Sequence, residues 1–565
     1  MSSPGLASLL LPFDAFDTST HQVMGRRVAG SSFAQGLAAS LKQGDQLSVF
    51  TGSRAALPAL QTLLQPVLTP GAQVELHADL DPALISKSGC LHLPDPALHH
   101  WCWLRADGVS SSFSLTGVTH TLCSHGVMQG LEQLVTAPLE PWDALVCTSR
   151  SALNVVKEAM ACMHERLERR FQQTLPPLQG PQLPLIPLGI DPEPLHWRGR
   201  FASRQEQRLQ ARQQLGLSPS ARVVLFLGRL SFHSKAHPLP LYRALERLSG
   251  EHELVLLECG HIFNADIATA YDQLGQWFPR LSRRRLGGLT PASDKEKSLA
   301  LAAADMFCSP ADNLQETFGL SVLEAMASSL PVVASDWNGY RDLVLNGSTG
   351  WLVPCRDLLQ VQSKPDVLDR QYGLGLQGYD STVGLRSLGV VLDHAAMEKA
   401  LCDLVGAPDR CAAMGEAARQ RIESVFAWRV VSEQYRELWS ELGERRASAC
   451  QQGNTHPWPI ANAARLFAAH ASAPPSSGPW WIDHQGSDPK LLTQTMQTCF
   501  LQELISIHSL ASLANHLQDK REEGGQWLNT DELEELYGRC QIPSHQWSRV
   551  TNLLEKLAVV TAAHP

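Results

Sequence analysis

The segment from Asp312 to Val353 constrains the fold of this 565-residue chain more than any other. An apolar run ends at Pro310, a polar loop carrying Glu316 follows, and a helix-favouring run through Leu323 to Ala327 leads to a second apolar run at Pro331–Ser335. Short apolar runs separated by a helix predict two buried parallel strands joined by a crossover. Such a unit places the loop acid at the carboxyl edge of a parallel sheet, where open α/β sheets bind ligands. The helix start behind it offers free N–H groups and a positive dipole end, which suits a phosphate.

Two acids, Glu316 and Glu324, bracket this turn with seven residues between them, and Phe318 and Gly319 lie inside the interval. With the Pro-Val-Val run behind it and Asn-Gly-x-x-Asp-Leu-Val following, this pattern resembles the signature of the retaining glycosyltransferases of family 4. The resemblance covers about residues 6–442. It implies an α/β chain of the GT-B class, in which two Rossmann-like domains face each other across a cleft, here followed by a C-terminal helical extension. An ordinary α/β crossover with two solvated acids is the alternative.

The resemblance also implies roles for the residues of this turn. Glu316 would contact the hydroxyls of a donor sugar, and Glu324 would accept from the ribose diol of the nucleotide, since two carboxylate oxygens can meet two donors. Phe318, Gly319 and Leu320 would meet the diphosphate and the sugar, because glycine lets the backbone approach a ligand closely.

Two cations are candidates for the diphosphate. Arg229 ends the buried run that starts at Arg222, and Lys235 follows in the next loop. They resemble the Gly-Arg…Lys pair of the family, although the interval is one residue longer than expected. Arginine fits a phosphate bidentately, and lysine acts as a point charge. The stretch Arg285–Leu289 is expected to be a loop near the nucleotide base.

In the first domain, His120 ends a strand-like run and resembles the histidine of the Thr-His-Thr-Leu turn, which faces the donor sugar in the family. A neutral imidazole can donate to a sugar hydroxyl or a phosphate oxygen. A satisfied core histidine is the alternative reading, and His125 is the competing candidate.

Gly25 and Gly30 stand where the family has a glycine-rich loop near the donor phosphates, but the usual adjacent pair is missing. Arg26 and Arg27 beside them could serve an anion, and solvated surface arginines are the alternative. The aromatic stretch Trp101–Arg105 is a candidate for stacking on an acceptor sugar, or a part of the core.

No metal and no cofactor are predicted, and a nucleotide-diphosphate sugar enters as donor substrate. Asp79-Leu80-Asp81 superficially matches a D-x-D metal motif, but it precedes a proline and is better explained as a turn or a helix N-cap. The 13 cysteines are scattered without a C-x-x-C pair, which favours a reducing cytoplasm over a disulfide framework or a zinc site. The first sixteen residues are read as a strand, not as a signal peptide.

Four regions are predicted: a first Rossmann-like, acceptor-side domain (1–190), a second, nucleotide-sugar-binding domain (191–445) whose final helices cross back to the first, a linker (446–490) and a helical extension (491–565). A loose Gly-rich insertion is expected at about 356–389. Acids outnumber bases in the extension, so protein contacts are favoured over DNA binding by a helix-turn-helix. The net charge of −9 also argues against a nucleic-acid partner. The helix through Lys157–Arg170 ends basic; its glutamates favour a solvated face, and peripheral association with the inner face of a membrane is the alternative.

These observations predict a retaining, metal-independent glycosyltransferase that moves a sugar from a nucleotide sugar to a glycan, a lipid-linked or a small-molecule acceptor. The alternatives are a non-catalytic nucleotide-sugar-binding or scaffold protein on the same fold, or a GT-B epimerase. A phosphorylase is disfavoured, because no stretch resembles a pyridoxal-phosphate lysine site.

Overall fold

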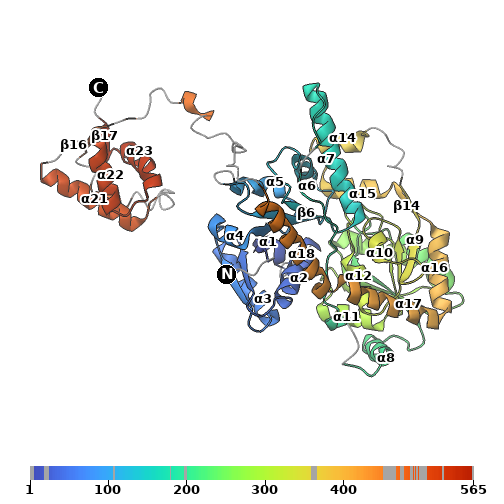
Figure 1. The fold of residues 1–565 in the computed structure, drawn as a ribbon. Coiled ribbons are helices and arrows are strands. Elements are labelled where there is room, and N and C mark those ends of the chain that lie inside the picture. Colours follow the sequence, from blue (N-terminus) through green and yellow to red (C-terminus); the bar gives the residue numbers. More distant parts are fainter. Residues whose placement is uncertain are drawn as a thin grey trace. The chain divides into compact units, whose positions relative to one another are not determined.

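Two sheets of six parallel strands each organise the first 450 residues of the chain (Figure 1). The computed structural model describes residues 6–17, 25–105, 109–177, 180–195, 200–357 and 365–449. In the C-terminal part it describes mainly residues 466–470, 478–483, 505–524 and 527–562. The chain divides into two compact units, Met1–Pro459 and Ile460–Pro565.

The first sheet has the strand order β3-β2-β1-β4-β5-β6. This is the doubly wound order of a Rossmann-like domain, with its switch point between β1 and β4. The predicted first strand is shorter than expected, because Pro12 opens a single helical turn. The strands are β1 (Ser8–Leu10), β2 (Gln46–Phe50), β3 (Gln73–His77), β4 (Cys90–His92), β5 (Ser114–Val118) and β6 (Ala144–Val146). The helices are α1 (Phe13–Phe16), α2 (Gly25–Ala39), α3 (Leu57–Leu64), α4 (Pro82–Ser88), α5 (Leu98–Trp101), α6 (His125–Gln133) and α7 (Arg150–Phe171).

The second sheet repeats the pattern in the order β12-β11-β10-β7-β8-β9. Residues 285–288, expected to be a loop, lie inside β9, where they pair with β8 in a parallel ladder. The strands are β7 (Arg222–Arg229), β8 (Leu254–His261), β9 (Ser282–Gly288), β10 (Met306–Ser309), β11 (Val332–Ser335) and β12 (Gly350–Val353). The helices are α8 (Arg204–Leu215), α9 (Leu239–Leu248), α10 (Ala265–Gln276), α11 (Asp294–Ala303), α12 (Leu320–Ala327), α13 (Tyr340–Leu343), α16 (His394–Gly406), α17 (Pro408–Arg421) and α18 (Trp428–Ala447).

The expected loose insertion is instead partly ordered. An antiparallel pair, β13 (Cys355–Asp357) with β14 (Val390–Leu392), closes its base, and it carries α14 (Val367–Gly373) and α15 (Tyr379–Ser387). Asp366 caps α14, and the Arg386 guanidinium holds both Asp366 carboxylate oxygens at 2.7 Å. These polar contacts explain why a glycine-rich stretch adopts a defined conformation.

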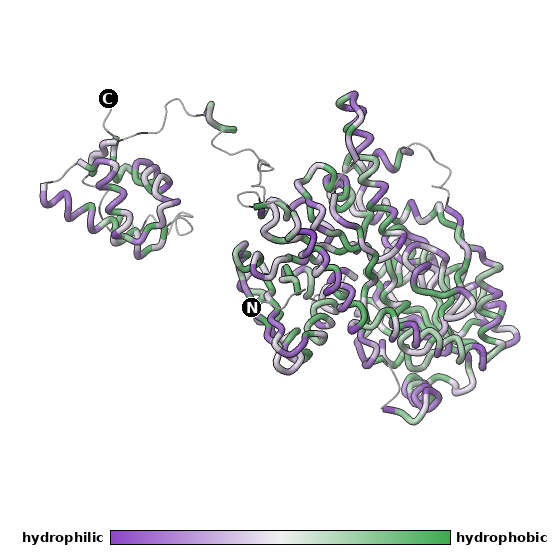
Figure 2. The backbone as a smooth tube through the Cα atoms, viewed as in Figure 1, coloured by the Kyte–Doolittle hydropathy of each residue, from purple (hydrophilic) through white to green (hydrophobic). Residues whose placement is uncertain are grey.

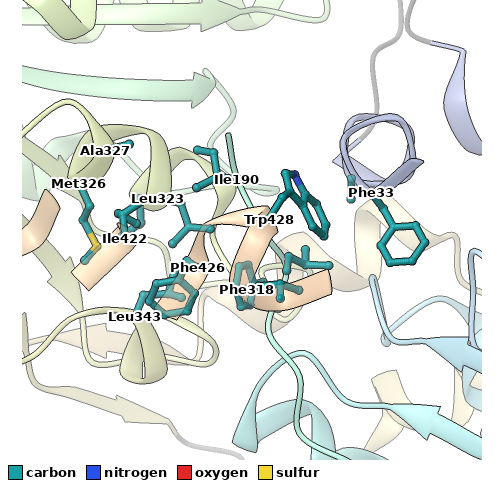
Figure 3. Packing of buried hydrophobic residues seen from close by; sticks show 14 of the residues in the cluster. Phe33, Ile190, Phe318, Leu323, Met326, Ala327, Leu343, Ile422, Phe426 and Trp428 are labelled. Atoms are coloured by element: carbon teal, nitrogen blue, oxygen red, sulfur yellow. The ribbon is translucent and has the colours of Figure 1, made fainter. Parts of the chain in front are cut away.

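The two Rossmann-like domains are joined by the last helix, α18, which packs on the first domain. Trp428 donates to Ser32 Oγ at 2.8 Å, and its ring meets Phe33 edge to face at 5.7 Å between centroids. Figure 3 shows this joint, where Phe318 and Phe426 of the second domain lie close to Trp428. One apolar core therefore runs through both domains.

The C-terminal unit has a core of its own and is mixed rather than purely helical. β15 (Trp480–Ile482), which the sequence assigned to a linker, is the middle strand between β16 (Trp527–Leu528) and β17 (Val560–Ala562). Trp480 and Ile482 are buried, which explains why this apolar stretch pairs. The helices are α21 (Ile507–Glu522), α22 (Thr530–Arg539) and α23 (Trp547–Lys556). Most of the remaining predicted linker lies outside the described residues.

Within the described residues, no helix combines the length and apolarity needed to cross a membrane. The C-terminal end of α7 is largely hydrophilic (Figure 2). Its arginines are matched by acids, since Arg166 pairs with Glu132 at 2.9 Å and Arg169 pairs with Glu165 at 3.1 Å.

Candidate active site

Glu316 is the centre of a charged cluster at the carboxyl edge of the second sheet. It lies in the loop between β10 and α12, and Lys235 forms an ion pair with its Oε2. The Tyr340 hydroxyl donates to the same oxygen at 3.2 Å and contacts Ser309 Oγ at 2.8 Å. Burial alone would raise the pKa of Glu316, but Lys235, Tyr340 and Arg229 hold it below the ordinary value. The carboxylate is therefore charged and oriented.

The same ion pair acts on the lysine. Burial alone would lower the pKa of Lys235, but the neighbouring Glu316 carboxylate outweighs it and raises the pKa above the ordinary value. Lys235 is therefore a fixed positive charge at neutral pH.

Asn313 joins the loop that carries Lys235 to the loop that carries Glu316 by hydrogen bonds, and this role was not predicted from the sequence. Its Nδ2 donates to the Lys235 carbonyl at 2.7 Å, while its Oδ1 accepts from Gln315 N at 2.9 Å and Glu316 N at 3.2 Å. Asn313 is fully buried. The only sequence signal is an asparagine three residues before an acid in a strand-to-helix loop, a position that favours such a turn.

Arg229 supplies a second cation. It ends β7 and is partly buried, with its guanidinium 5.9 Å from the Phe263 ring centroid. Burial lowers its pKa, and the Glu316 charge partly offsets this. Among the residues that the structure describes, no acid forms an ion pair with Arg229. A partly buried guanidinium of this kind suits an anionic ligand.

The start of α12 lies beside these charges. Its N-cap is Gly319 with φ +116°, a conformation that side-chain-bearing residues rarely adopt. A Cβ there would lie 2.5 Å from the Tyr340 ring. Leu320 is the first helical residue, whereas the Phe318 side chain is buried in the core. The Thr317 carbonyl accepts from Ser149 Oγ of the first domain at 3.1 Å, so the two domains meet at this turn.

The second predicted acid, Glu324, faces Lys297. The lysine Nζ lies 2.5 Å from Glu324 Oε1, and the Glu324 side chain is only 15% exposed. Lys297 lies in α11, and nothing in the sequence pattern distinguishes it from the surface lysines. No hydrogen bond from the described residues reaches Glu324 Oε2, so this oxygen can accept from a ligand hydroxyl.

His120 follows β5 in the first domain. Burial and the nearby charge of Arg26 lower its pKa to about 4, partly offset by a hydrogen bond to the Pro94 backbone. The imidazole is therefore neutral. Because proline offers only a carbonyl acceptor, the one N–H of His120 donates to Pro94, and the other ring nitrogen remains as an acceptor. His125, the competing candidate, uses Nε2 to donate to the Gly373 carbonyl of the insertion at 3.2 Å.

The predicted glycine loop differs from expectation. Gly25 begins α2, and Gly30 lies inside this helix, where a Cβ would approach the Ala15 carbonyl oxygen to 2.2 Å. Gly30 thus allows α1 and α2 to pack closely and is not a loop residue facing phosphates. Residues 18–24 lie outside the described residues. Arg26 pairs with Asp95 at 3.1 Å and with Asp14 at 3.4 Å.

Two other candidates have structural explanations. Asp81 is the N-cap of α4 and accepts from Ala83 N at 2.8 Å. In the stretch Trp101–Arg105 the two tryptophans pack against the first-domain core, and Arg105 forms a buried ion pair with Asp143 at 2.7 Å. Arg105 is therefore a core residue, whereas the two tryptophans are half-buried and their stacking on an acceptor sugar stays a prediction.

The structure thus brings Glu316, Lys235, Arg229 and the start of α12 into one cluster, with Glu324 on the same helix facing Lys297. His120 donates to the Pro94 backbone and lies near the charge of Arg26, and both groups belong to the first domain.

Residues 221–364 match the family described as group 1 glycosyl transferases. The chain is 28% identical over 297 residues to phosphatidyl-myo-inositol mannosyltransferase of Mycobacterium leprae. The aligned part covers 50% of this chain and 65% of the relative. It is 24% identical over 360 residues to alpha-maltose-1-phosphate synthase of Mycolicibacterium smegmatis, in an alignment that covers 61% of this chain and 79% of that relative. Among solved structures, sucrose-phosphate synthase from Thermosynechococcus elongatus is 18% identical, with a TM-score of 0.47, and covers 78% of this chain and 100% of that one.

Proposed function

We propose that this chain, whose residues 221–364 match the group 1 glycosyl transferases, moves a sugar from a nucleotide-sugar donor to an acceptor hydroxyl. One observation carries the proposal. At the carboxyl edge of the second sheet, a buried and oriented carboxylate lies between two cations and the start of a helix. That set of groups matches a ligand with sugar hydroxyls on one side and a diphosphate on the other.

Sugar transfer requires departure of a nucleoside diphosphate while the sugar gains oxocarbenium character. Arg229, Lys235 and the N–H groups at the start of α12 would take up the charge that develops on the leaving phosphate. Groups fixed in place before the reaction stabilise such charge most effectively. Glu316 would hold the donor sugar, and Glu324 would accept from the ribose of the nucleotide.

The Lys235–Glu316 pair suggests an exchange of partners. A donor diphosphate would compete with Glu316 for the Lys235 ammonium, which would free carboxylate oxygens for the sugar hydroxyls. Tyr340, within reach of both groups, would keep Glu316 oriented during this exchange.

The reaction is proposed to retain configuration, by attack of the acceptor on the same face from which the phosphate leaves, with a leaving phosphate oxygen as the base. It is also proposed to need no metal, because Arg229 and Lys235 can balance the diphosphate. The acceptor is a glycan, a lipid-linked or a small-molecule hydroxyl, and we expect the protein to act in the cytoplasm or peripherally at the inner membrane face.

A donor screen tests the proposal. Purified protein is incubated with UDP-glucose, GDP-mannose and ADP-glucose, with and without EDTA, and nucleotide release is recorded. We expect one donor to be hydrolysed slowly and independently of EDTA. Glu316→Gln and Lys235→Met should lower that rate by about 10²- to 10³-fold, whereas Lys295→Met, an exposed lysine of α11, should not.

Other outcomes decide between the alternatives. Donor binding without nucleotide release from any donor would favour a nucleotide-sugar-binding or scaffold protein. Release that requires added metal would contradict the proposed balance of charge.

A further inference from the structure

The insertion between β12 and α16 reaches from the second domain to the first (Figure 1). The Tyr372 hydroxyl of α14 donates to the Cys123 carbonyl at 2.8 Å, and the His125 ring lies edge to face on the Tyr372 ring at 5.8 Å. The next backbone carbonyl, at Gly373, accepts from His125. The segment that these contacts hold begins three residues after His120.

A second contact joins α15 to the same segment. The Tyr379 hydroxyl lies 3.6 Å from Cys123 Sγ. Burial raises the pKa of both groups, so phenol and thiol are neutral and the contact is an ordinary hydrogen bond. Tyr372 is buried and Tyr379 half-buried, so water competes weakly for these bonds.

The insertion also touches the loop that carries the donor cations. A Cβ on Gly384 of α15 would lie 2.9 Å from His233 Cβ, so this helix packs directly against the loop between Arg229 and Lys235. Arg229 is also close enough to Asp380 of α15 to interact with its charge. One insertion therefore contacts both the segment after His120 and the loop between the two cations.

We propose that Tyr372 and Tyr379 are positioning residues, which fix the segment His120–His125 of the first domain relative to the donor loop Arg229–Lys235. This inference rests on the proposed function. A bare nucleoside diphosphate needs only groups of the second domain, whereas sugar transfer needs groups of both. Hydrogen bonds that join the two sides therefore affect turnover more than binding of the nucleotide.

Tyr372→Phe and Tyr379→Phe, combined, test the proposal. Each change removes one hydroxyl and keeps the ring, so the fold is preserved. With the donor that the wild type hydrolyses among UDP-glucose, GDP-mannose and ADP-glucose, we expect kcat to fall about tenfold while the donor KM changes less than about twofold. The Kd of the corresponding nucleoside diphosphate, measured by calorimetry, should also stay within about twofold. Tyr537→Phe is the matched control, since it removes a 2.8 Å hydrogen bond to Thr551 inside the C-terminal unit.

Amide hydrogen exchange gives a readout independent of catalysis. The double variant should exchange faster at residues 121–126, with the rest of the first domain unchanged. If kcat and exchange both equal those of the wild type, or if nucleotide binding is lost together with kcat, the positioning role is wrong. If the wild type hydrolyses no donor, the proposed function fails, and the exchange experiment alone then decides whether the tyrosines hold this segment.

Discussion

Both glutamates of the candidate site lie against a lysine from another β-α unit of the second sheet. Lys235 follows β7 and pairs with Glu316, and Lys297 of α11 pairs with Glu324. A carboxylate in a largely buried place needs such a partner to stay charged. The pairing orients both side chains as acceptors for hydroxyl groups, and we expect nucleotide binding to be sensitive to either member of each pair.

Glu324→Gln should weaken binding of the nucleoside diphosphate about 10- to 100-fold, because hydrogen bonds to a charged acceptor contribute about 1.5–3 kcal/mol. The variant should also lose its preference for the ribonucleotide over the 2′-deoxy analogue. Titration calorimetry with both ligands measures this. Equal losses for both ligands would show that Glu324 does not contact the ribose.

His92 is a buried core residue whose pKa is far below the ordinary value for histidine. Its Nδ1 forms a 2.9 Å hydrogen bond with Thr116 Oγ1, which also accepts from Trp439 at 3.2 Å. Burial, with a smaller contribution from His120, lowers the pKa of His92 to about 3. The folded protein therefore keeps this ring neutral where the unfolded chain, with an ordinary pKa near 6.5, takes up a proton.

Stability should consequently fall as the pH drops from about 6.5 towards 3, since the unfolded state binds more protons in that window. Between pH 7 and pH 5, His92 alone should lower the free energy of unfolding by about 2 kcal/mol. Urea denaturation at the two pH values measures the difference. In His92→Gln the pH-dependent part should shrink by this amount, and an unchanged slope would contradict the assignment.

At the scale of elements, the second sheet and its crossovers follow directly from apolar runs such as Val223–Leu227 and Val332–Ala334, whose burial leaves little choice of fold. The cluster around Glu316 was predictable because its members end strands of one sheet. Asn313, Tyr340 and Lys297 were not, since their roles depend on which loops meet in space. The defined conformation of residues 365–389 could not be predicted either. It depends on the contact between Arg386 and Asp366, which lie twenty residues apart, whereas composition alone indicates a loose segment.

The turn into α12 is sensitive to a single methyl group at Gly319. Gly319→Ala should lower the free energy of unfolding by about 1–3 kcal/mol, from left-handed strain and the clash with the Tyr340 ring. It should also displace the backbone that we propose to face the diphosphate. Thermal unfolding and nucleotide binding measure both effects. Gly406→Ala in α16, with no described atom within 4 Å of its Cβ position, is the control and should be tolerated. Wild-type binding by Gly319→Ala would remove this turn from the site.

At the scale of the whole molecule, the joint at α18 determines whether the two Rossmann-like domains act together. Trp428→Ala should cost about 3–5 kcal/mol, because the ring fills the space between Phe33, Gly36 and Gly189. Chemical denaturation measures the loss, with Trp277→Ala as control, since Trp277 is 81% exposed. A loss below about 1 kcal/mol would mean that the joint can repack or that the domains fold without it.

The path of the backbone at this joint has a consequence for how the protein can be divided. Where the chain enters the second domain, the Ile190 N–H donates to the Phe426 carbonyl at 2.8 Å. Where the chain returns, the Trp428 N–H donates to the Ile190 carbonyl at 3.1 Å. The first domain is thus assembled from two distant stretches of the gene, one encoding residues 1–190 and one encoding α18. A chimera that takes only residues 1–190 from a relative would pack the relative's first domain against the α18 helix of this chain, whose side chains fit a different surface. Recombination that respects the structure must move both stretches together.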